Sequence, residues 1–112
     1  MTCRYCFALD LKDDPQSIAE YRMHHQNIWP EVTGGLKAIG VAGLEIYLAG
    51  NRLFMILEAG PSFSLEAKTK ADLENPCIEE WERLMWKYQQ PLPQAKPGEK
   101  WLLMERIFRL EA

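Results

Sequence analysis

The chain has 112 residues, of which 47% are hydrophobic and 26% are charged, and its formal net charge at pH 7 is −3. This length supports one domain around one core, and the lack of a basic excess argues against nucleic acid as a partner. No apolar run approaches the ~20 residues that span a bilayer, and an odd number of cysteines argues against a secreted disulfide framework, so we expect a cytoplasmic protein with no membrane partner.

The first part of the chain predicts a strand followed by a helix. Apolar side chains alternate over residues 3–11, which is typical of a strand. Asp14 and Pro15 provide an N-cap and a first-turn proline, so a helix is expected to begin there and to run through Ile28. It should end or kink before Pro30, because proline disfavours the helical conformation of the residue before it.

The middle of the chain predicts a short helix or turn and then a β-hairpin. Glycines at positions 34 and 35 weaken the helix or turn that follows Pro30. Apolar residues then alternate over residues 43–48 and again over 53–59. A Gly50-Asn51 turn separates these two runs, which predicts a hairpin.

The last part of the chain predicts two helices, a loop and a strand. Residues 64–73 are expected to form one helix, and Asn75 and Pro76 start another whose apolar side chains recur at helical spacing. Three prolines make residues 91–98 a loop. Residues 101–110 are then expected to form a final strand.

These elements, in the order β-α-β-β-α-β, predict a single α+β domain over residues 1–112 with a ferredoxin-like antiparallel sheet and helices on one face. The other face would carry many apolar side chains without a cover. Burial against a second subunit removes such a surface from water. We therefore expect a homodimer that packs sheet to sheet.

His25 is the first candidate for chemistry, because it shares the apolar stripe of Ile18, Tyr21 and Ile28 and should point inward. Burial lowers the pKa of an imidazole and leaves it able to accept and donate protons near neutral pH. A histidine on an apolar stripe is also commonly a hydrogen-bonded core residue, and this alternative stays open. The neighbouring His24 should face a more polar side.

Trp86 is the unusual residue of the last helix, since it lies off the apolar stripe and beside Glu79 and Glu82. An aromatic ring among carboxylates is a common way to hold a sugar, whose C–H face stacks on the ring while its hydroxyls meet polar groups. Packing of the ring against a loop or a partner subunit is the alternative. The residues by themselves favour neither.

A Cys3-x-x-Cys6 pair suggests a metal or redox site, but residues three apart on a strand point to opposite faces. A zinc site would need two more ligands, and only Cys77 and two histidines remain. The chain also lacks the motifs of phosphate, dinucleotide and serine-nucleophile sites. We therefore expect no metal and no cofactor.

Residues 20–31 resemble the Glu-Tyr-x-x-x-His-x-x-Ile-Trp-Pro-Glu motif of the L-rhamnose mutarotase family. The similarity covers nearly the whole chain in the same order of elements. The resemblance implies a dimeric α/β barrel and an isomerase that interconverts the α and β anomers of a 6-deoxy-L-hexose, a monosaccharide, without cofactor or metal. The further matching segments are Ile46-Tyr47-Leu48, Trp86-Lys87-Tyr88 and Arg106-Ile107-Phe108.

The resemblance also implies the site residues. The histidine that matches His25 is the proposed proton donor, the tyrosine that matches Tyr21 contacts the sugar, and Trp86 matches the second of two tryptophans that line the pocket. Met85 stands where the family has the first of these tryptophans, and Leu44 where it has a pocket tyrosine. Because these changes remove an indole N–H and a hydroxyl, L-fucose becomes a candidate substrate beside L-rhamnose.

Mutarotation needs a proton delivered to the ring oxygen and another removed from the anomeric hydroxyl. We expect His25 to be the acid on opening and the base on reclosure, with Tyr21 orienting it or the sugar. The complementary base stays open among Glu45, Glu58, Glu105 and bound water. Two other classes also fit the fold. One is a non-catalytic sugar-binding or dimerisation module, and the other is a dimeric-barrel monooxygenase or haem-handling protein with a histidine ligand.

Overall fold

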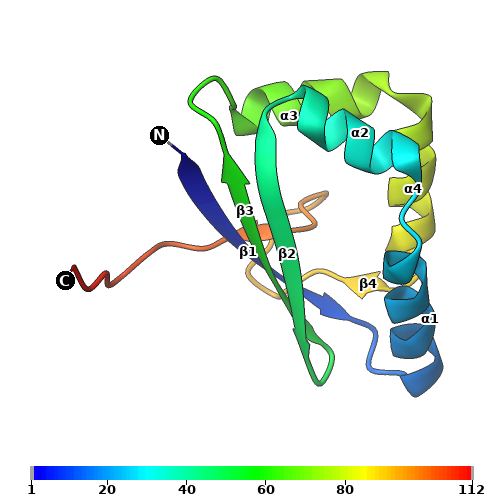
Figure 1. The fold of residues 1–112 in the computed structure, drawn as a ribbon. Coiled ribbons are helices and arrows are strands. Elements are labelled where there is room, and N and C mark those ends of the chain that lie inside the picture. The colour runs from blue at the N-terminus through cyan, green and yellow to red at the C-terminus, as the bar shows by residue number, and fades with distance from the viewer. Residues whose placement is uncertain (1, 112) are drawn as a thin grey trace.

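An antiparallel sheet with helices packed on one side forms the protein, in a computed structural model that describes residues 2–111 (Figure 1). Among these residues no helix is both long and apolar enough to cross a membrane. The elements in chain order are β1 (Cys3–Leu11), α1 (Pro15–Gln26), α2 (Pro30–Ala38), β2 (Val41–Ala49), β3 (Arg52–Ala59), α3 (Leu65–Glu74), α4 (Pro76–Trp86), β4 (Gln89–Gln90) and β5 (Leu102–Leu103).

The sheet has the strand order β2-β3-β1-β4, and β5 also pairs with β1. All strand pairs are antiparallel; in the central pair, Phe7 lies opposite Met55 and Leu9 opposite Leu53. The predicted α+β class with an antiparallel sheet is therefore confirmed. The hairpin and the helices that precede and follow it are also confirmed, with ends that differ by one or two residues.

The helices begin where polar caps stand in the sequence. Asp14 Oδ2 accepts a hydrogen bond from the Ser17 backbone N–H at 3.0 Å, directly ahead of Pro15. Asn75 Oδ1 likewise accepts from the Cys77 backbone N–H at 3.0 Å at the start of α4. Each cap pairs a backbone donor that the first turn of a helix leaves free, so these helix starts are local properties of the sequence.

Helix α1 ends at Gln26, two residues before Ile28, through which the sequence predicted it to run. Trp29 has φ −58° and ψ 134°, the extended conformation that a following proline favours. Since α2 starts at Pro30, Asn27 and Ile28 must turn the chain between the two helices. The side chains of Ile28 and Trp29 still pack against the core.

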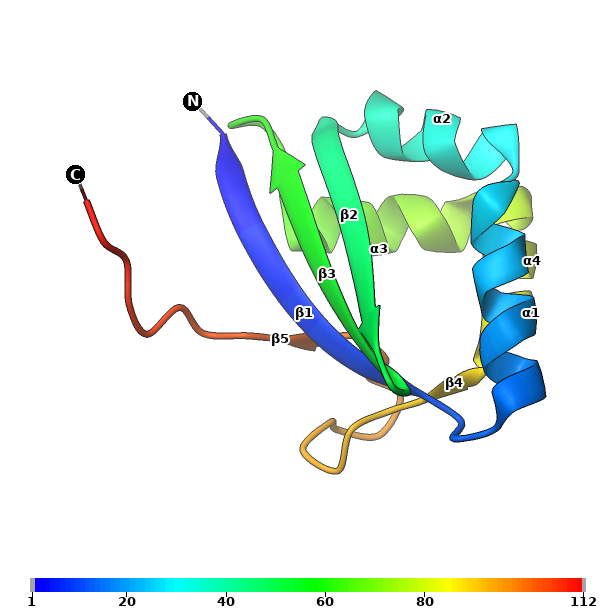
Figure 2. The same cartoon turned by 60° about the horizontal axis from the view of Figure 1, so that its bottom comes forward.

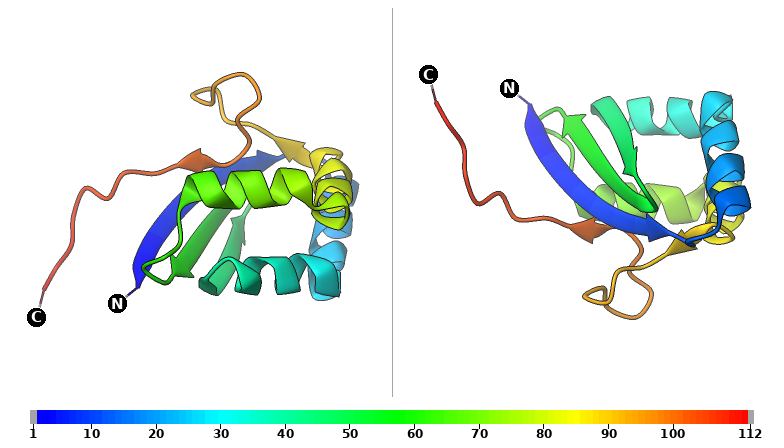
Figure 3. Two further views of the ribbon diagram at one scale, coloured as in Figure 1. Left: turned by 90° about the horizontal axis from the view of Figure 1, so that it is seen from above. Right: turned by 90° about the horizontal axis from the view of Figure 1, so that it is seen from below.

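The predicted final strand over residues 101–110 is wrong for most of its length. Only Leu102–Leu103 pair with β1, and residues 104–111 form no strand within the part of the chain described. This tail runs away from the helices (Figures 1 and 3), and it leaves Ile107 89% and Phe108 75% exposed. An alternating pattern makes a segment suited to a strand, but whether the segment pairs depends on its tertiary context. The Met104 backbone N–H still donates to the Cys6 carbonyl oxygen at 2.8 Å, and beyond Met104 no described residue of the tail pairs with β1.

The core lies between the sheet and the helices. Leucines of β1 and β3 are fully buried on the covered face of the sheet, and α4 adds an apolar stripe to them. In Figure 3, α2 and α3 stand over this face while α1 and α4 close its far end. Burying one such side chain stabilises the fold by about 1.5–3 kcal/mol. The residues are Leu9, Leu11, Leu53 and Leu57 of the sheet, with Ile78, Trp81 and Met85 of α4.

The opposite face of the sheet carries no helix (Figure 2). Strand alternation places a second set of apolar side chains there, and these residues are called the bare face below. Tyr47, at 52% exposed, is the most open of them. The bare face consists of Cys6, Ala8, Tyr47, Phe54 and Ile56.

Candidate active site

A cavity of about 120 Å³ lies between the covered face of the sheet and the helices. Its walls come from all four helices, from β2 and β3, and from the segments around β4 and β5, and most of them are apolar. An apolar hollow with a few polar groups is the usual form of a small-molecule site. The polar side chains in the wall are Tyr21, His25, Lys68, Asp72, Glu82 and Gln89.

His25 lies half-buried on α1, with its Nδ1 atom 2.9 Å from the backbone carbonyl oxygen of Tyr21. Because a carbonyl oxygen only accepts, Nδ1 must carry a proton, and Nε2 of the neutral ring keeps its lone pair. Burial lowers the pKa of His25; the hydrogen bond to Tyr21 opposes this shift, and nearby His24 adds to it. His25 is therefore a mainly neutral imidazole at pH 7, with Nε2 available to accept a proton.

Tyr21 packs beside His25, with the two ring centroids 4.3 Å apart. Its hydroxyl oxygen accepts a hydrogen bond from Gln89 Nε2 at 3.3 Å. Burial raises the pKa of Tyr21 to about 12, opposed by the Gln89 hydrogen bond and supported by the Glu82 carboxylate. The hydroxyl therefore keeps its proton, and it can donate that proton to a bound ligand.

Most of the site residues predicted from the sequence come together in this cavity. Trp86 does not line it. The Trp86 residue is 40% exposed, and Lys100 Nζ lies 4.9 Å from the centroid of its ring, so the ring packs against the segment before β5. The predicted residues that do line the cavity are Tyr21, His25, Leu44 and Met85.

The strand and tail carboxylates considered as complementary base lie outside this cavity. Glu45 is exposed and accepts a hydrogen bond from the Tyr47 hydroxyl at 3.1 Å. Glu58 pairs with Arg4 at 2.9 Å, and Glu105 lies in the exposed tail. Glu45 and Glu58 occupy the strand positions that alternate with the cavity-lining ones, so their side chains belong to the other side of the sheet.

Two carboxylates that the sequence did not single out as bases do line the cavity, Asp72 of α3 and Glu82 of α4. Asp72 Oδ2 accepts from Lys68 Nζ at 2.6 Å, and Glu82 pairs with Lys100. An i,i+4 lysine and aspartate pair is common on exposed helix surfaces. The pattern alone therefore gave no sign that this pair faces a cavity.

His24 belongs to a separate hydrogen-bond network. Its Nε2 lies 3.3 Å from the Tyr88 hydroxyl, which donates to Glu20 Oε1 at 3.0 Å. Since the Tyr88 proton is directed to Glu20, its oxygen accepts the proton of His24 Nε2. His24 is half-buried, and its hydrogen bond to the polar hydroxyl of Tyr88 ties α1 to the segment after α4.

The cysteines carry free thiols, with Cys3 and Cys77 exposed and Cys6 half-buried. Across residues 2–111, no three His, Cys, Asp or Glu side chains are grouped so as to hold a metal ion. The cavity instead gathers a neutral imidazole, a tyrosine hydroxyl, an amide and two lysine-paired carboxylates. Such groups bind hydroxyls and transfer protons.

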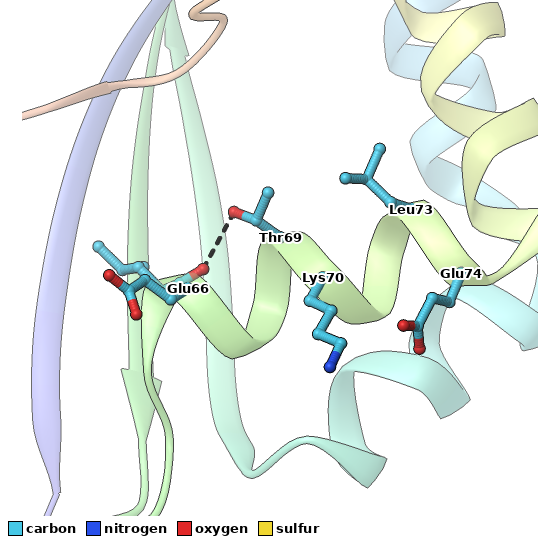
Figure 4. Close-up of a pocket in the computed structure, with 6 residues that line it drawn as sticks. Glu66, Thr69, Lys70, Leu73 and Glu74 are labelled. Carbon is cyan, nitrogen blue, oxygen red and sulfur yellow. Dashed lines mark hydrogen bonds between the residues drawn. The ribbon is translucent and has the colours of Figure 1, made fainter.

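A second hollow of about 540 Å³ lies along the exposed face of α3 (Figure 4). All of its lining residues come from this one helix. Figure 4 shows Thr69 and Leu73 pointing to one side and Lys70 and Glu74 to the other, and the only bond drawn, from Thr69 Oγ1 to the Leu65 carbonyl oxygen at 3.0 Å, is internal to the helix. The side chains do not converge on a common point, so this hollow has no arrangement of functional groups.

The chain is similar to sugar mutarotases over nearly its whole length. An L-fucose mutarotase from Xanthomonas campestris pv. campestris is 44% identical over 109 residues, which cover 96% of this chain and 87% of that protein. An L-rhamnose mutarotase from Acidiphilium cryptum is 30% identical over 92% of this chain and 95% of that protein.

Solved structures show the same fold. An L-rhamnose mutarotase from Formosa agariphila matches with a TM-score of 0.71 and 24% identity, over 97% of this chain and 99% of that one. The tetracenomycin F2 cyclase from Streptomyces glaucescens, a polyketide cyclase, matches with a TM-score of 0.62 and 16% identity over 98% of each chain. At these identities the likeness concerns the fold alone.

The family model described as L-rhamnose mutarotase matches residues 4–110, almost the entire chain. Together with the relatives at 30% and 44% identity, this match decides the family. The chain belongs to the L-rhamnose mutarotase family and is an isomerase of the sugar mutarotase type.

Proposed function

We propose that this 6-deoxy-L-hexose mutarotase interconverts the α and β anomers of L-fucose in the cytosol. The observation that carries the choice of sugar is the 44% identity with an L-fucose mutarotase, against 30% with an L-rhamnose mutarotase, over similar shares of the chain. Free thiols at all three cysteines fit a reducing compartment.

The wall of the cavity supports this choice of sugar. Leu44 and Met85 are apolar, and both stand where the family pattern has an aromatic residue with a polar atom. L-fucose and L-rhamnose share an apolar C6 methyl and differ in the configuration of the hydroxyls at C2 and C4. A change of hydrogen-bonding groups in the wall alters which of these hydroxyls can be paired, and so which sugar is preferred.

His25 carries the proton transfers in this proposal. Its neutral Nε2 takes the proton of the anomeric hydroxyl, and the resulting imidazolium gives a proton to the ring oxygen, which breaks the bond between C1 and that oxygen. Both oxygens are attached to C1, so one imidazole can serve both. After the aldehyde has rotated, the reverse transfers close the ring on the other face, and His25 ends as it began.

The remaining polar groups position the sugar. The Tyr21 hydroxyl donates a hydrogen bond and, beside His25 on α1, holds the anomeric centre near the imidazole. Asp72 and Glu82 are the carboxylates within the cavity that can accept sugar hydroxyls. Trp86 acts from outside the lining by packing under Lys100, the partner of Glu82.

We propose a homodimer that buries the bare face. Phe54 and Ile56 stand in the centre of this face, half-exposed in a single chain. The tail after β5 adds more exposed apolar surface on the side of the sheet that lacks helices (Figure 3). Packing of two such faces would remove both surfaces from water and produce a barrel of two sheets.

The test of the sugar is saturation-transfer proton NMR on the anomeric signals of L-fucose and L-rhamnose, with and without the protein. We expect faster exchange between anomers for L-fucose, and a smaller effect or none for L-rhamnose. Preferential acceleration of L-rhamnose would keep the mutarotase and reject the substrate. No acceleration of either sugar would reject the activity.

A further inference from the structure

Gln89, the first residue of β4, is a polar side chain buried in the wall of the active-site cavity. It is 4% exposed, it lies opposite Leu11 of β1, and most of the other residues that line the cavity are apolar. Neither the family motif nor the sequence pattern assigns it a role. A buried amide needs hydrogen-bond partners for both of its polar atoms, so its partners are informative.

Only half of this amide is paired. Its Nε2 donates to the Tyr21 hydroxyl oxygen at 3.3 Å, while Oε1 is buried without a hydrogen-bond partner in the part of the chain that the structure describes. A buried carbonyl oxygen without a donor destabilises a fold, and folded proteins contain few of them. The unpaired atom belongs to a residue that lines the cavity, where a ligand can supply the missing donor.

The backbone keeps the amide in this position. Strand β4 pairs with the end of β1, with Gln89 opposite Leu11 and Gln90 opposite Asp10. The Lys12 backbone N–H also donates to the Tyr88 carbonyl oxygen at 2.8 Å. With its main chain held on the sheet, Gln89 keeps its side chain on the face that lines the cavity.

We infer that Gln89 is a substrate-binding residue whose Oε1 accepts a hydrogen bond from a sugar hydroxyl, next to the Tyr21 hydroxyl that donates one. This inference rests on the proposed function, since it takes a sugar as the ligand. The Tyr21 oxygen already accepts from Gln89, so the tyrosine proton is free for the sugar. An acceptor and a donor side by side match neighbouring ring hydroxyls, each of which can donate and accept.

This arrangement makes Gln89 a specificity determinant. A site that buries a carbonyl oxygen for one hydroxyl discriminates strongly against a sugar that lacks this hydroxyl or holds it in another direction. Removal of the hydroxyl from the sugar and removal of the amide from the protein must then weaken the same interaction. The two changes together should cost little more than either one alone.

The experiment measures anomer exchange by NMR for L-fucose and its 2-, 3- and 4-deoxy derivatives. It compares Gln89→Met, which keeps the length of the side chain, with Gln90→Met, a matched control at the exposed next position of β4. We expect Gln89→Met to lower kcat/KM for L-fucose by roughly 5- to 150-fold, and by much less for the one derivative that lacks the bound hydroxyl. Gln90→Met should match the wild type on every sugar.

Thermal unfolding of the ligand-free variants separates binding from structure. Since methionine removes an unpaired buried carbonyl, the midpoint of Gln89→Met should equal or exceed that of the wild type. A lowered midpoint together with equal losses on all four sugars would overturn the inference and leave Gln89 as a core residue. Unchanged kcat/KM for L-fucose would overturn it as well.

The sugar preference of the wild-type protein separates the inference about Gln89 from the proposed choice of substrate. If it accelerates L-rhamnose and not L-fucose, the proposed sugar fails, and the same variants are measured on L-rhamnose and its deoxy derivatives with the same expectation for Gln89. If it accelerates neither sugar, the proposed function fails, and the inference fails with it.

Discussion

The two faces of the sheet are built from the same strands but differ in how far their side chains are buried. Along β3, Leu53, Leu57 and Ala59 are at most 1% exposed, whereas Phe54 and Ile56 between them stay half-exposed. The covered face surrounds a cavity with the polar groups of the candidate active site. The bare face is an apolar strip that one chain leaves open to water.

The polar groups on the two faces differ as well. On the covered face they gather inside the cavity, where most are buried or half-buried. On the bare face, cross-strand ion pairs stand at the two ends of the apolar strip, Arg4 with Glu58 at 2.9 Å and Arg52 with Asp10 at 2.7 Å. An apolar centre with a charged rim is typical of protein interfaces, which agrees with the proposed dimer.

The largest effect should come from the covered face. His25→Gln removes the proposed proton carrier, and we expect the catalysed exchange of anomers to fall by about 10²- to 10⁴-fold. His24→Gln is the matched control, since the neighbouring ring bonds to Tyr88 outside the cavity, and it should keep most of the activity. Equal losses of activity in the two variants would contradict the assignment of proton transfer to His25.

Substitutions at two neighbouring positions of β3 compare how tightly the two faces of the sheet are packed. Leu57 is 0% exposed, so Leu57→Ala should lower the free energy of unfolding by about 2–5 kcal/mol, measured by urea titration. Ile56→Ala should cost less at low protein concentration, where a bare face stays open. Its cost should rise with protein concentration, because the proposed dimer would bury this side chain. A cost that is independent of concentration would argue against burial of Ile56 in a dimer.

A charged side chain introduced into the bare face should change the oligomeric state of the protein but not its fold. Ile56→Lys places an ammonium in the centre of the apolar strip, where a partner subunit would have to desolvate it. Size-exclusion chromatography with light scattering should then report a monomer, against a dimer for the wild type, with an unchanged circular dichroism spectrum. A dimeric Ile56→Lys protein would mean that the copies associate through another surface.

The smallest effect is the pH dependence that His25 gives to stability. Because its pKa in the folded protein is lowered below the ordinary 6.5, the unfolded chain binds the proton more readily. The stability linked to this group is present above about pH 6.5 and is lost as the pH falls through the lower, folded value. The wild type should therefore lose more thermal stability than His25→Gln between about pH 7.5 and about pH 5.5. Parallel losses would contradict this.

The sequence by itself predicted the features that depend on neighbours in the chain. Caps such as Asp14 and Asn75 bond to residues two or three positions away, and strand alternation is a property of the backbone. Tyr21 and His25 stand one helical turn apart, so their presence on one face also followed from spacing. Each of these features needs only short-range contacts, and each appears in the structure.

Only the tertiary structure decided which side chains meet. Tyr21 and Gln89 are bonded across 68 positions of sequence, and Asp72 and Glu82 enter the cavity from two different helices. Trp86 packs against Lys100 outside the cavity, and the tail after β5 forms no strand although its residues alternate. Helical and strand periods fix the direction of a side chain within its own element, but the packing of the elements determines what that side chain faces.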